Sequence, residues 1–116
     1  MIMARKYLRK SEFRYYTNPK YLSKNGVPHP AYITAKYNKR YKFNVITHSK
    51  HFFNSDTKEL ERNPNHNRDK PKDERQSRIS VSHWDKEKYF SKDKLEYWRF
   101  TNKDKATVKK WNRKGK

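Results

Sequence analysis

The five histidines of this sequence are the side chains best suited to acid–base chemistry. An imidazole accepts or donates a proton near neutral pH, and nearby lysine or arginine side chains stabilise charge on phosphoryl oxygens. This combination suffices for metal-independent cleavage of RNA, because the 2′-hydroxyl of the substrate supplies the nucleophile. Each candidate can equally be a binding or surface residue. The groups on or beside the expected strands are His29, Thr47, His48, Arg78, Ser80 and His83, and the candidate catalytic set is His29, Thr47 and His48.

Composition excludes several other catalytic classes. The chain has no cysteine, so it has no cysteine nucleophile, no thiolate zinc site and no disulfide scaffold. Its two glycines, Gly26 and Gly115, cannot build a glycine-rich phosphate loop or a nucleophile elbow. His48 and His51 are spaced as two ligands on a helix would be, but no third ligand accompanies them. We therefore expect no metal site and no cofactor.

The charge balance indicates a polyanionic partner. The 116 residues include 31 Lys and Arg against 12 Asp and Glu, a formal net charge of +19. Base composition explains part of this bias, because the codons for Lys, Asn and Tyr are AT-rich. The codons for Glu are comparably AT-rich, however, and acidic residues are few. An anionic membrane would require an amphipathic apolar face that the sequence lacks, so nucleic acid is the favoured partner.

Tyrosines alternate with basic residues through the first half of the chain. A tyrosine can stack on a base while a neighbouring Lys or Arg binds phosphate, an arrangement that suits single-stranded RNA or DNA. Alternatively, most of these tyrosines form the core, since Leu, Ile, Val and Phe together number only 18. The nucleic-acid-binding residues that we expect are Arg14, Lys20, Lys36, Lys39, Arg40, Lys42, Arg78, Lys105, Lys109, Lys110, Arg113, Tyr32 and Tyr37.

A hairpin is predicted to position the candidate catalytic residues. Apolar residues alternate in 31–37 and again in 41–47, as in half-buried strands. Asn38 begins the turn between them, and Asn tolerates the left-handed conformation that such turns require. His29 then precedes the first strand and Thr47 ends the second. Further strands are expected at 78–82 and 95–100.

A short basic helix is expected at 101–114. Thr101 followed by Asp104 resembles a capping box, with Asp in place of the usual Glu or Gln. Val108 and Trp111 would share its inward side, and basic residues would form a cationic ridge on the rest. Residues 6–16 are predicted to form a second basic amphipathic helix.

A long polar loop is expected at 54–77. This stretch holds six basic and six acidic residues, two prolines and almost no apolar residue besides Leu60. Loops of this length inside a small domain are often functional flaps, although a solvated linker is the alternative.

Two stretches carry a family resemblance. Residues 26–34, Gly-Val-Pro-His-Pro-Ala-Tyr-Ile-Thr, and residues 42–49, Lys-Phe-Asn-Val-Ile-Thr-His-Ser, resemble the opening of PemK/MazF-like toxins of toxin–antitoxin modules. The resemblance covers about 25 of the 116 residues and implies a small barrel that cleaves or binds RNA. It places Thr47 where that family keeps its active-site Thr. It places His29 where the family keeps a catalytic Arg, which is a departure from the family pattern, and the acidic entry strand is missing.

These observations predict one small α+β domain. We expect an antiparallel, barrel-like sheet of four or five short strands, a basic segment at 1–25, the polar loop and the C-terminal helix. No apolar run is long enough for a membrane span or a signal peptide, so we expect a soluble, cytoplasmic protein without a membrane partner. The favoured function is nucleic-acid binding, RNA over DNA, in a phage or mobile element. The alternatives are a metal-independent ribonuclease toxin, and a basic protein that folds on or inhibits an acidic protein or ribonucleoprotein.

Overall fold

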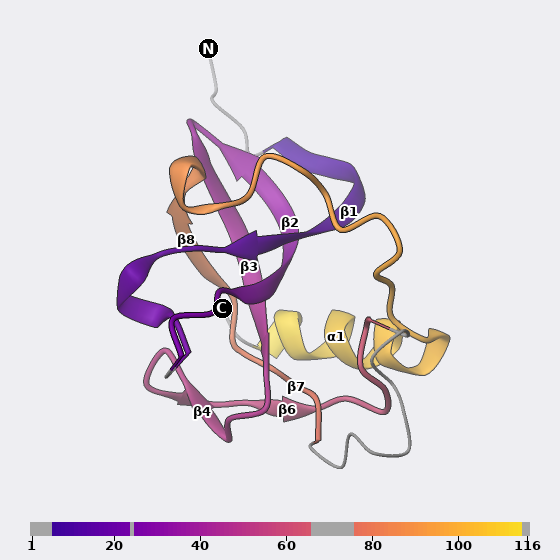
Figure 1. Cartoon of the computed structure of the whole chain (residues 1–116). Helices are drawn as coiled ribbons and strands as arrows, with labels where there is room; N and C mark the ends of the chain where they lie inside the picture. The colour runs from indigo at the N-terminus through magenta and orange to yellow at the C-terminus, as the bar shows by residue number, and fades with distance from the viewer. Residues whose placement is uncertain (1–5, 24, 66–75, 115–116) are drawn as a thin grey trace.

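The computed structural model describes residues 6–23, 25–65 and 76–114 (Figure 1). Within them the chain is an α+β protein, in which an antiparallel sheet carries one C-terminal α-helix. The elements are β1 (Lys6–Tyr16), the short 3-10 helix η1 (Pro19–Tyr21), β2 (His29–Tyr37), β3 (Arg40–Thr47), β4 (His51–Phe52), β5 (Ser55–Asp56), β6 (Lys58–Glu59), β7 (Arg78–Ile79), β8 (His83–Lys86), η3 (Glu87–Tyr89) and α1 (Asn102–Lys114).

The sheet has the strand order β1-β2-β3-β7-β6, and β8 pairs with the first half of β3. β4 and β5 form a separate small hairpin. The sheet does not close, so the expected barrel-like form is only loosely met. Residues 89–91 nevertheless run beside the outer edge of β1. There the Tyr89 carbonyl accepts from the Thr17 N–H at 2.6 Å, and the Tyr15 carbonyl accepts from the Ser91 N–H at 3.0 Å.

The predicted hairpin is formed by β2 and β3 with a two-residue turn. Ala31 lies opposite Val45 in its register. Asn38 and Lys39 have φ values of 48° and 61°. Two successive residues with positive φ make the tight turn whose twist matches that of the strands. Asn38 therefore has the predicted left-handed conformation, and Arg40 belongs to β3 rather than to the turn.

Both faces of the sheet are covered, because side chains alternate between two apolar clusters. The first cluster includes the buried side chains of Ile33, Phe43 and Phe90, and aromatic rings make up much of it. The second cluster includes Ile46 and Val108, and lies between the opposite face of the sheet and α1. Aromatic side chains thus supply much of the core in both clusters, as the small number of Leu and Val residues in the chain requires.

The start of α1 confirms the predicted cap. The Thr101 hydroxyl accepts a hydrogen bond from the Asp104 N–H at 3.1 Å. Asp104 itself is buried, and its carboxylate accepts from the N–H groups of Glu61 (2.8 Å) and Arg62 (3.1 Å). The acidic residue of the expected capping box therefore anchors another segment to the helix. As predicted, Val108 is buried and Trp111 is half-buried.

Two predictions about local structure are wrong, and a third is confirmed only in part. Residues 6–16 form β1 rather than a helix, since Phe13 and Tyr16 join opposite faces of the sheet. Residues 95–100 form no strand; Leu95 and Phe100 pack into the second cluster from an irregular segment. Of the expected strand at 78–82, only Arg78–Ile79 forms a strand, β7, which pairs with β3 on one side and with β6 on the other. The chain then continues into β8.

The predicted polar loop is partly packed on the domain. It contains β5 and β6, and the side chains of Leu60 and Pro64 are fully buried. Residues 66–75 of the predicted loop, like 1–5 of the N-terminal segment, lie outside the described residues.

Candidate nucleic-acid interface

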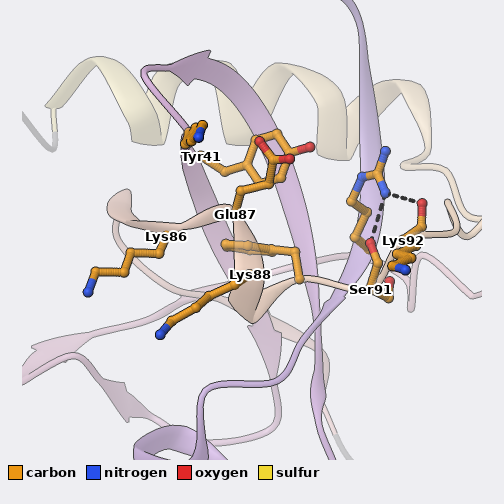
Figure 2. A pocket seen from close by; sticks show the side chains of 9 residues that line it. Tyr41, Lys86, Glu87, Lys88, Ser91 and Lys92 are labelled. Atoms are coloured by element: carbon orange, nitrogen blue, oxygen red, sulfur yellow. Dashed lines mark hydrogen bonds between the residues drawn. The ribbon is translucent and has the colours of Figure 1, made fainter.

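A groove of about 830 Å³ opens between the tip of the β2–β3 hairpin and residues 86–92 (Figure 2). The pairing of β3 with β8 places the two sides of the groove next to each other. Arg40 pairs with Lys86, and the Lys39 carbonyl accepts a hydrogen bond from the Glu87 N–H at 2.9 Å. The buried rings of Tyr41 and Phe90 lie at its base. The basic residues that line this groove are Arg14, Lys39, Lys86, Lys88 and Lys92.

Arg14 fixes one wall of the groove. Its guanidinium pairs with the Glu12 carboxylate at 3.0 Å. It also donates hydrogen bonds to the carbonyl oxygens of Ser91, at 2.8 Å, and Lys92, drawn as dashed lines in Figure 2. Because its donors are used inside the protein, Arg14 holds the 91–92 segment against β1.

Tyr41 lies beneath two cationic side chains. The Arg14 guanidinium carbon and the Lys36 ammonium lie 5.8 and 5.6 Å from the centre of its ring. Lys36 also pairs with the Glu87 carboxylate at 2.9 Å, and this hydrogen bond raises the pKa of Lys36. The Lys36–Glu87 pair thus links β2 to η3 beside the groove, and it neutralises the carboxylate that lines it.

Four exposed lysines give the groove its charge. Lys39, Lys86, Lys88 and Lys92 form no ion pair with any residue that the structure describes. Lys88 lies 5.1 Å from the centre of the Tyr89 ring. In Figure 2 the side chains of Lys86 and Lys88 extend in the same direction, away from the ribbon. These lysines are available to an anionic ligand.

A second hollow, of about 660 Å³, shares Arg14 and Lys92 with the groove. We call it the aromatic hollow, because Tyr97 and Trp98 line it. Tyr97 is 82% exposed, and Lys94 pairs across the surface with Glu12 at 3.1 Å. The two hollows form neighbouring parts of one surface along residues 86–98.

The candidate catalytic residues form a row across three strands. The β2–β3 register, extended by two residues from Ala31 opposite Val45, brings His29 beside Thr47. Thr47 is paired on its other side with Arg78 of β7. His48 follows Thr47; burial lowers the pKa of His29, and the charge of His48 lowers it further. The structure thus pairs Thr47 with Arg78 and places His48 close enough to His29 to affect its pKa.

The polar groups of this row are largely engaged. The Thr47 hydroxyl accepts from the Ser49 N–H at 3.1 Å, and Thr47 is buried. The Arg78 guanidinium donates to the Thr57 hydroxyl (2.7 Å) and carbonyl (2.9 Å) and pairs with Glu59 at 3.1 Å. His48 Nδ1 lies 3.0 Å from the Gln76 carbonyl.

Burial lowers the pKa of His29 and of His83, so both imidazoles favour the neutral form. His83 stacks on Phe53 with the ring centres 4.3 Å apart. His83 is the first residue of β8, paired in register with Phe43, and therefore lies outside the row. Ser80 is fully buried and donates to the Val81 carbonyl while accepting from the Val45 N–H, a structural role.

None of the other predicted basic residues lines the groove. Lys20 is exposed beside the Tyr21 ring, Arg40 donates to the Trp84 carbonyl at 3.5 Å, and Lys42 is half-buried. The cations of α1 are exposed on the opposite face of the sheet, since α1 packs on the second cluster. These α1 residues are Lys105, Lys109, Lys110 and Arg113.

Neither predicted stacking tyrosine lines the groove. The ring of Tyr32 packs against Phe13 and Phe100, at centre distances of 5.1 and 4.7 Å. Tyr37 is half-buried at the end of β2. The core therefore uses Tyr32, in agreement with the alternative that tyrosines supply apolar surface.

Sequence reasoning missed most of the groove. Only Arg14 and Lys39 are among the expected residues; Lys86, Lys88 and Lys92 of the groove and Tyr97 of the aromatic hollow are not. The signal was a run of alternating charge at 86–94, in which lysines occupy every second position except one. Its meaning depends on β8 pairing with β3, which local sequence does not disclose.

Comparison with known proteins found no matching family model, no matching curated protein and no matching solved structure. Among the described residues, no three His, Asp or Glu side chains are grouped to hold a metal ion. In the same part of the chain, no helix has the length and apolar character needed to cross a membrane.

Proposed function

We propose that this is a cytoplasmic nucleic-acid-binding protein whose groove takes the phosphate backbone, with RNA favoured over DNA. The observation that carries the proposal is the set of four exposed lysines, Lys39, Lys86, Lys88 and Lys92, which converge on a hollow without ion-pair partners among the described residues. RNA is favoured because the row of His29, Thr47 and Arg78, at the other end of the β2–β3 hairpin from the groove, has chemistry suited to a substrate with a 2′-hydroxyl.

A concave cationic surface is a stronger phosphate site than a convex one. Low-dielectric walls focus the field of several like charges into the hollow, and a bound polyanion releases condensed counterions. Two contacts hold the walls of the groove in place: Arg14 donates hydrogen bonds to the carbonyls of residues 91–92, and the Lys36–Glu87 ion pair connects β2 to η3. The lysines are thus presented from a rigid frame. The basic residues of α1 are more numerous but project from a convex helix.

Two variants with the same charge change test this proposal. In the groove variant, Lys39, Lys86, Lys88 and Lys92 are replaced by Gln. In the control variant, Lys105, Lys109, Lys110 and Arg113 of α1 are replaced by Gln. All eight side chains are exposed, so both variants should keep the fold. We expect RNA affinity to fall by about 100-fold or more in the groove variant and by less than about tenfold in the control. Equal losses, or a larger loss in the α1 variant, would place the interface elsewhere.

A metal-independent ribonuclease, of the kind found in toxin–antitoxin modules, is the second candidate. The row of His29, Thr47 and Arg78 on adjacent strands, with His48 beside it, favours it. A neutral His29 would act as the general base, and Arg78 would stabilise charge on the phosphoryl oxygens. Such a toxin would have a small acidic protein as its partner. Binding remains the first proposal, because Arg78 and Thr47 already have internal hydrogen-bond partners.

A further inference from the structure

The most exposed large aromatic side chain among the described residues is Tyr97, which is 82% exposed. Its neighbour Trp98 packs inward, with ring centres 5.8 Å from Phe13 and 6.4 Å from Tyr15. Tyr97 makes no comparable ring contact within the part of the chain that the structure describes. Its ring therefore has no role in packing the domain and presents a free face to solvent.

Tyr97 is held at the tip of a fixed turn. The Trp98 N–H donates to the Leu95 carbonyl at 3.2 Å and closes the turn. On one side the Leu95 N–H donates to the Phe13 carbonyl at 2.8 Å, and on the other the Arg99 N–H donates to the Pro64 carbonyl at 3.1 Å. Because the backbone is already anchored, stacking a ligand on the ring orders only the Tyr97 side chain and adds no cost of backbone ordering.

The groove and the aromatic hollow differ in charge. The groove presents unpaired lysines, whereas the aromatic hollow is also lined by the carboxylates of Asp93 and Glu96. Carboxylates repel phosphates but leave the uncharged face of a base unaffected. A nucleic acid that spans both parts would place its phosphates over Lys86, Lys88 and Lys92 and a base over Tyr97.

We infer that the groove and the aromatic hollow together bind a single strand, with one base stacked on Tyr97, rather than a duplex. This inference rests on the proposed function and adds the class of nucleic acid. A duplex keeps its bases stacked on one another, so Tyr97 can contribute only to a single strand. Stacking of one base on an aromatic side chain contributes roughly 1–3 kcal/mol.

The test compares a single-stranded RNA of about 12 nucleotides with a duplex of the same base composition whose two strands are joined by a non-nucleotide linker, by fluorescence anisotropy at one salt concentration. We expect the wild-type protein to bind the single strand more tightly. Tyr97→Ala and Tyr97→Leu should each weaken that binding by about tenfold, or about 1.4 kcal/mol. Tyr97→Phe, which keeps the ring, should bind like wild type. Duplex affinity should be the same in all four proteins, because no substitution changes the charge.

The outcomes separate the inference from the proposed function. Salt-dependent binding of both probes with no effect of Tyr97→Ala, or equal affinity for the duplex, would overturn the single-strand inference and leave the groove proposal standing. An equal loss in Tyr97→Leu and Tyr97→Phe would attribute the effect to the hydroxyl group and overturn stacking. No binding of either probe would overturn both.

Discussion

Asn44 and Asn112 exchange hydrogen bonds across the interface between the sheet and α1. The Asn44 amide nitrogen donates to the Asn112 side-chain oxygen at 2.7 Å, and the Asn112 amide nitrogen donates to that of Asn44 at 3.0 Å. Asn44 is fully buried and also donates to the Ser80 carbonyl at 2.9 Å. The pair fixes the C-terminal half of α1 on β3, where the second cluster alone would leave its position less specific.

Asn44→Ala should therefore lower the free energy of unfolding by about 1–3 kcal/mol, because it removes three hydrogen bonds and takes the acceptor from the Asn112 amide nitrogen. Trp111 still donates to the Ser80 carbonyl, and Ser82 still donates to the Asn112 oxygen. Urea denaturation followed by circular dichroism measures the change. RNA affinity of the folded variant should match wild type, since the pair lies on the face opposite the groove. Unchanged stability would show that water replaces the amide pair.

Asp104→Ala should destabilise the protein by about 2 kcal/mol or more, because two N–H donors, those of Glu61 and Arg62, lose a charged acceptor. Asp104→Asn keeps one acceptor oxygen and should cost less than Ala. Hydrogen exchange at these two amides provides a local measurement: their protection should fall in Asp104→Ala while that of β2 stays high. Protection that is unaltered at 61–62 would contradict the anchoring role.

Stability should decrease as the pH falls through about 6.5. Burial lowers the pKa of His29 and His83 below the ordinary value of 6.5, so the unfolded chain binds protons at a pH where the folded chain does not. The contribution is fully present above the unfolded-state pKa, is lost as the pH falls below it, and levels off beneath the folded-state pKa. Asp85 is a separate case. Partial burial favours its acid form, but hydrogen bonds from Tyr16 and Asn18 outweigh this and lower its pKa, so its contribution is lost only in stronger acid.

Urea denaturation of wild type and of the variant His29→Gln, His83→Gln from pH 8 to pH 5 checks this. The variant should show a flatter profile across that range. A wild-type profile that rises as the pH falls would contradict the lowered pKa values.

His29→Ala, Thr47→Ala and His48→Ala test the ribonuclease candidate. At least one of them should slow RNA cleavage by about 10²-fold or more if the row is catalytic. Cleavage should persist in EDTA and should spare 2′-deoxy substrates. Binding should persist in all three, since none changes the formal charge at neutral pH. If the wild-type protein shows no cleavage in EDTA at micromolar concentration, the ribonuclease candidate is wrong and binding remains.

The central hairpin and α1 could be predicted because their signals are local. Alternating apolar residues and Asn38 specify the β2–β3 turn, and Thr101 specifies the start of the helix. The sequence of residues 6–16 predicts a helix, because Phe13 and Tyr16, three residues apart, match a helical stripe. A strand places such residues on opposite faces, which is favourable only when both faces are covered. The cover on the second face comes from α1, more than 80 residues later.

The groove could not be predicted for a related reason. Its two walls are Lys39 in the hairpin turn and residues 86–92, which meet only through the pairing of β3 with β8. Charge counts identified a basic protein but could not say which lysines converge. That His29, Thr47 and Arg78 lie near strand ends could be predicted from the sequence. The hydrogen bond of Arg78 to Thr57 and its ion pair with Glu59 could not.

The salt dependence of RNA binding tests the central claim most directly. If the four groove lysines contact phosphates, each should contribute about 0.7–0.9 to the slope of log K against log salt concentration. The wild-type slope should then be about −3 or steeper. In the groove variant the magnitude of the slope should decrease by about 3. The α1 variant should keep most of the wild-type slope. A flat wild-type response, or a groove variant with the wild-type slope, would contradict phosphate binding in the groove.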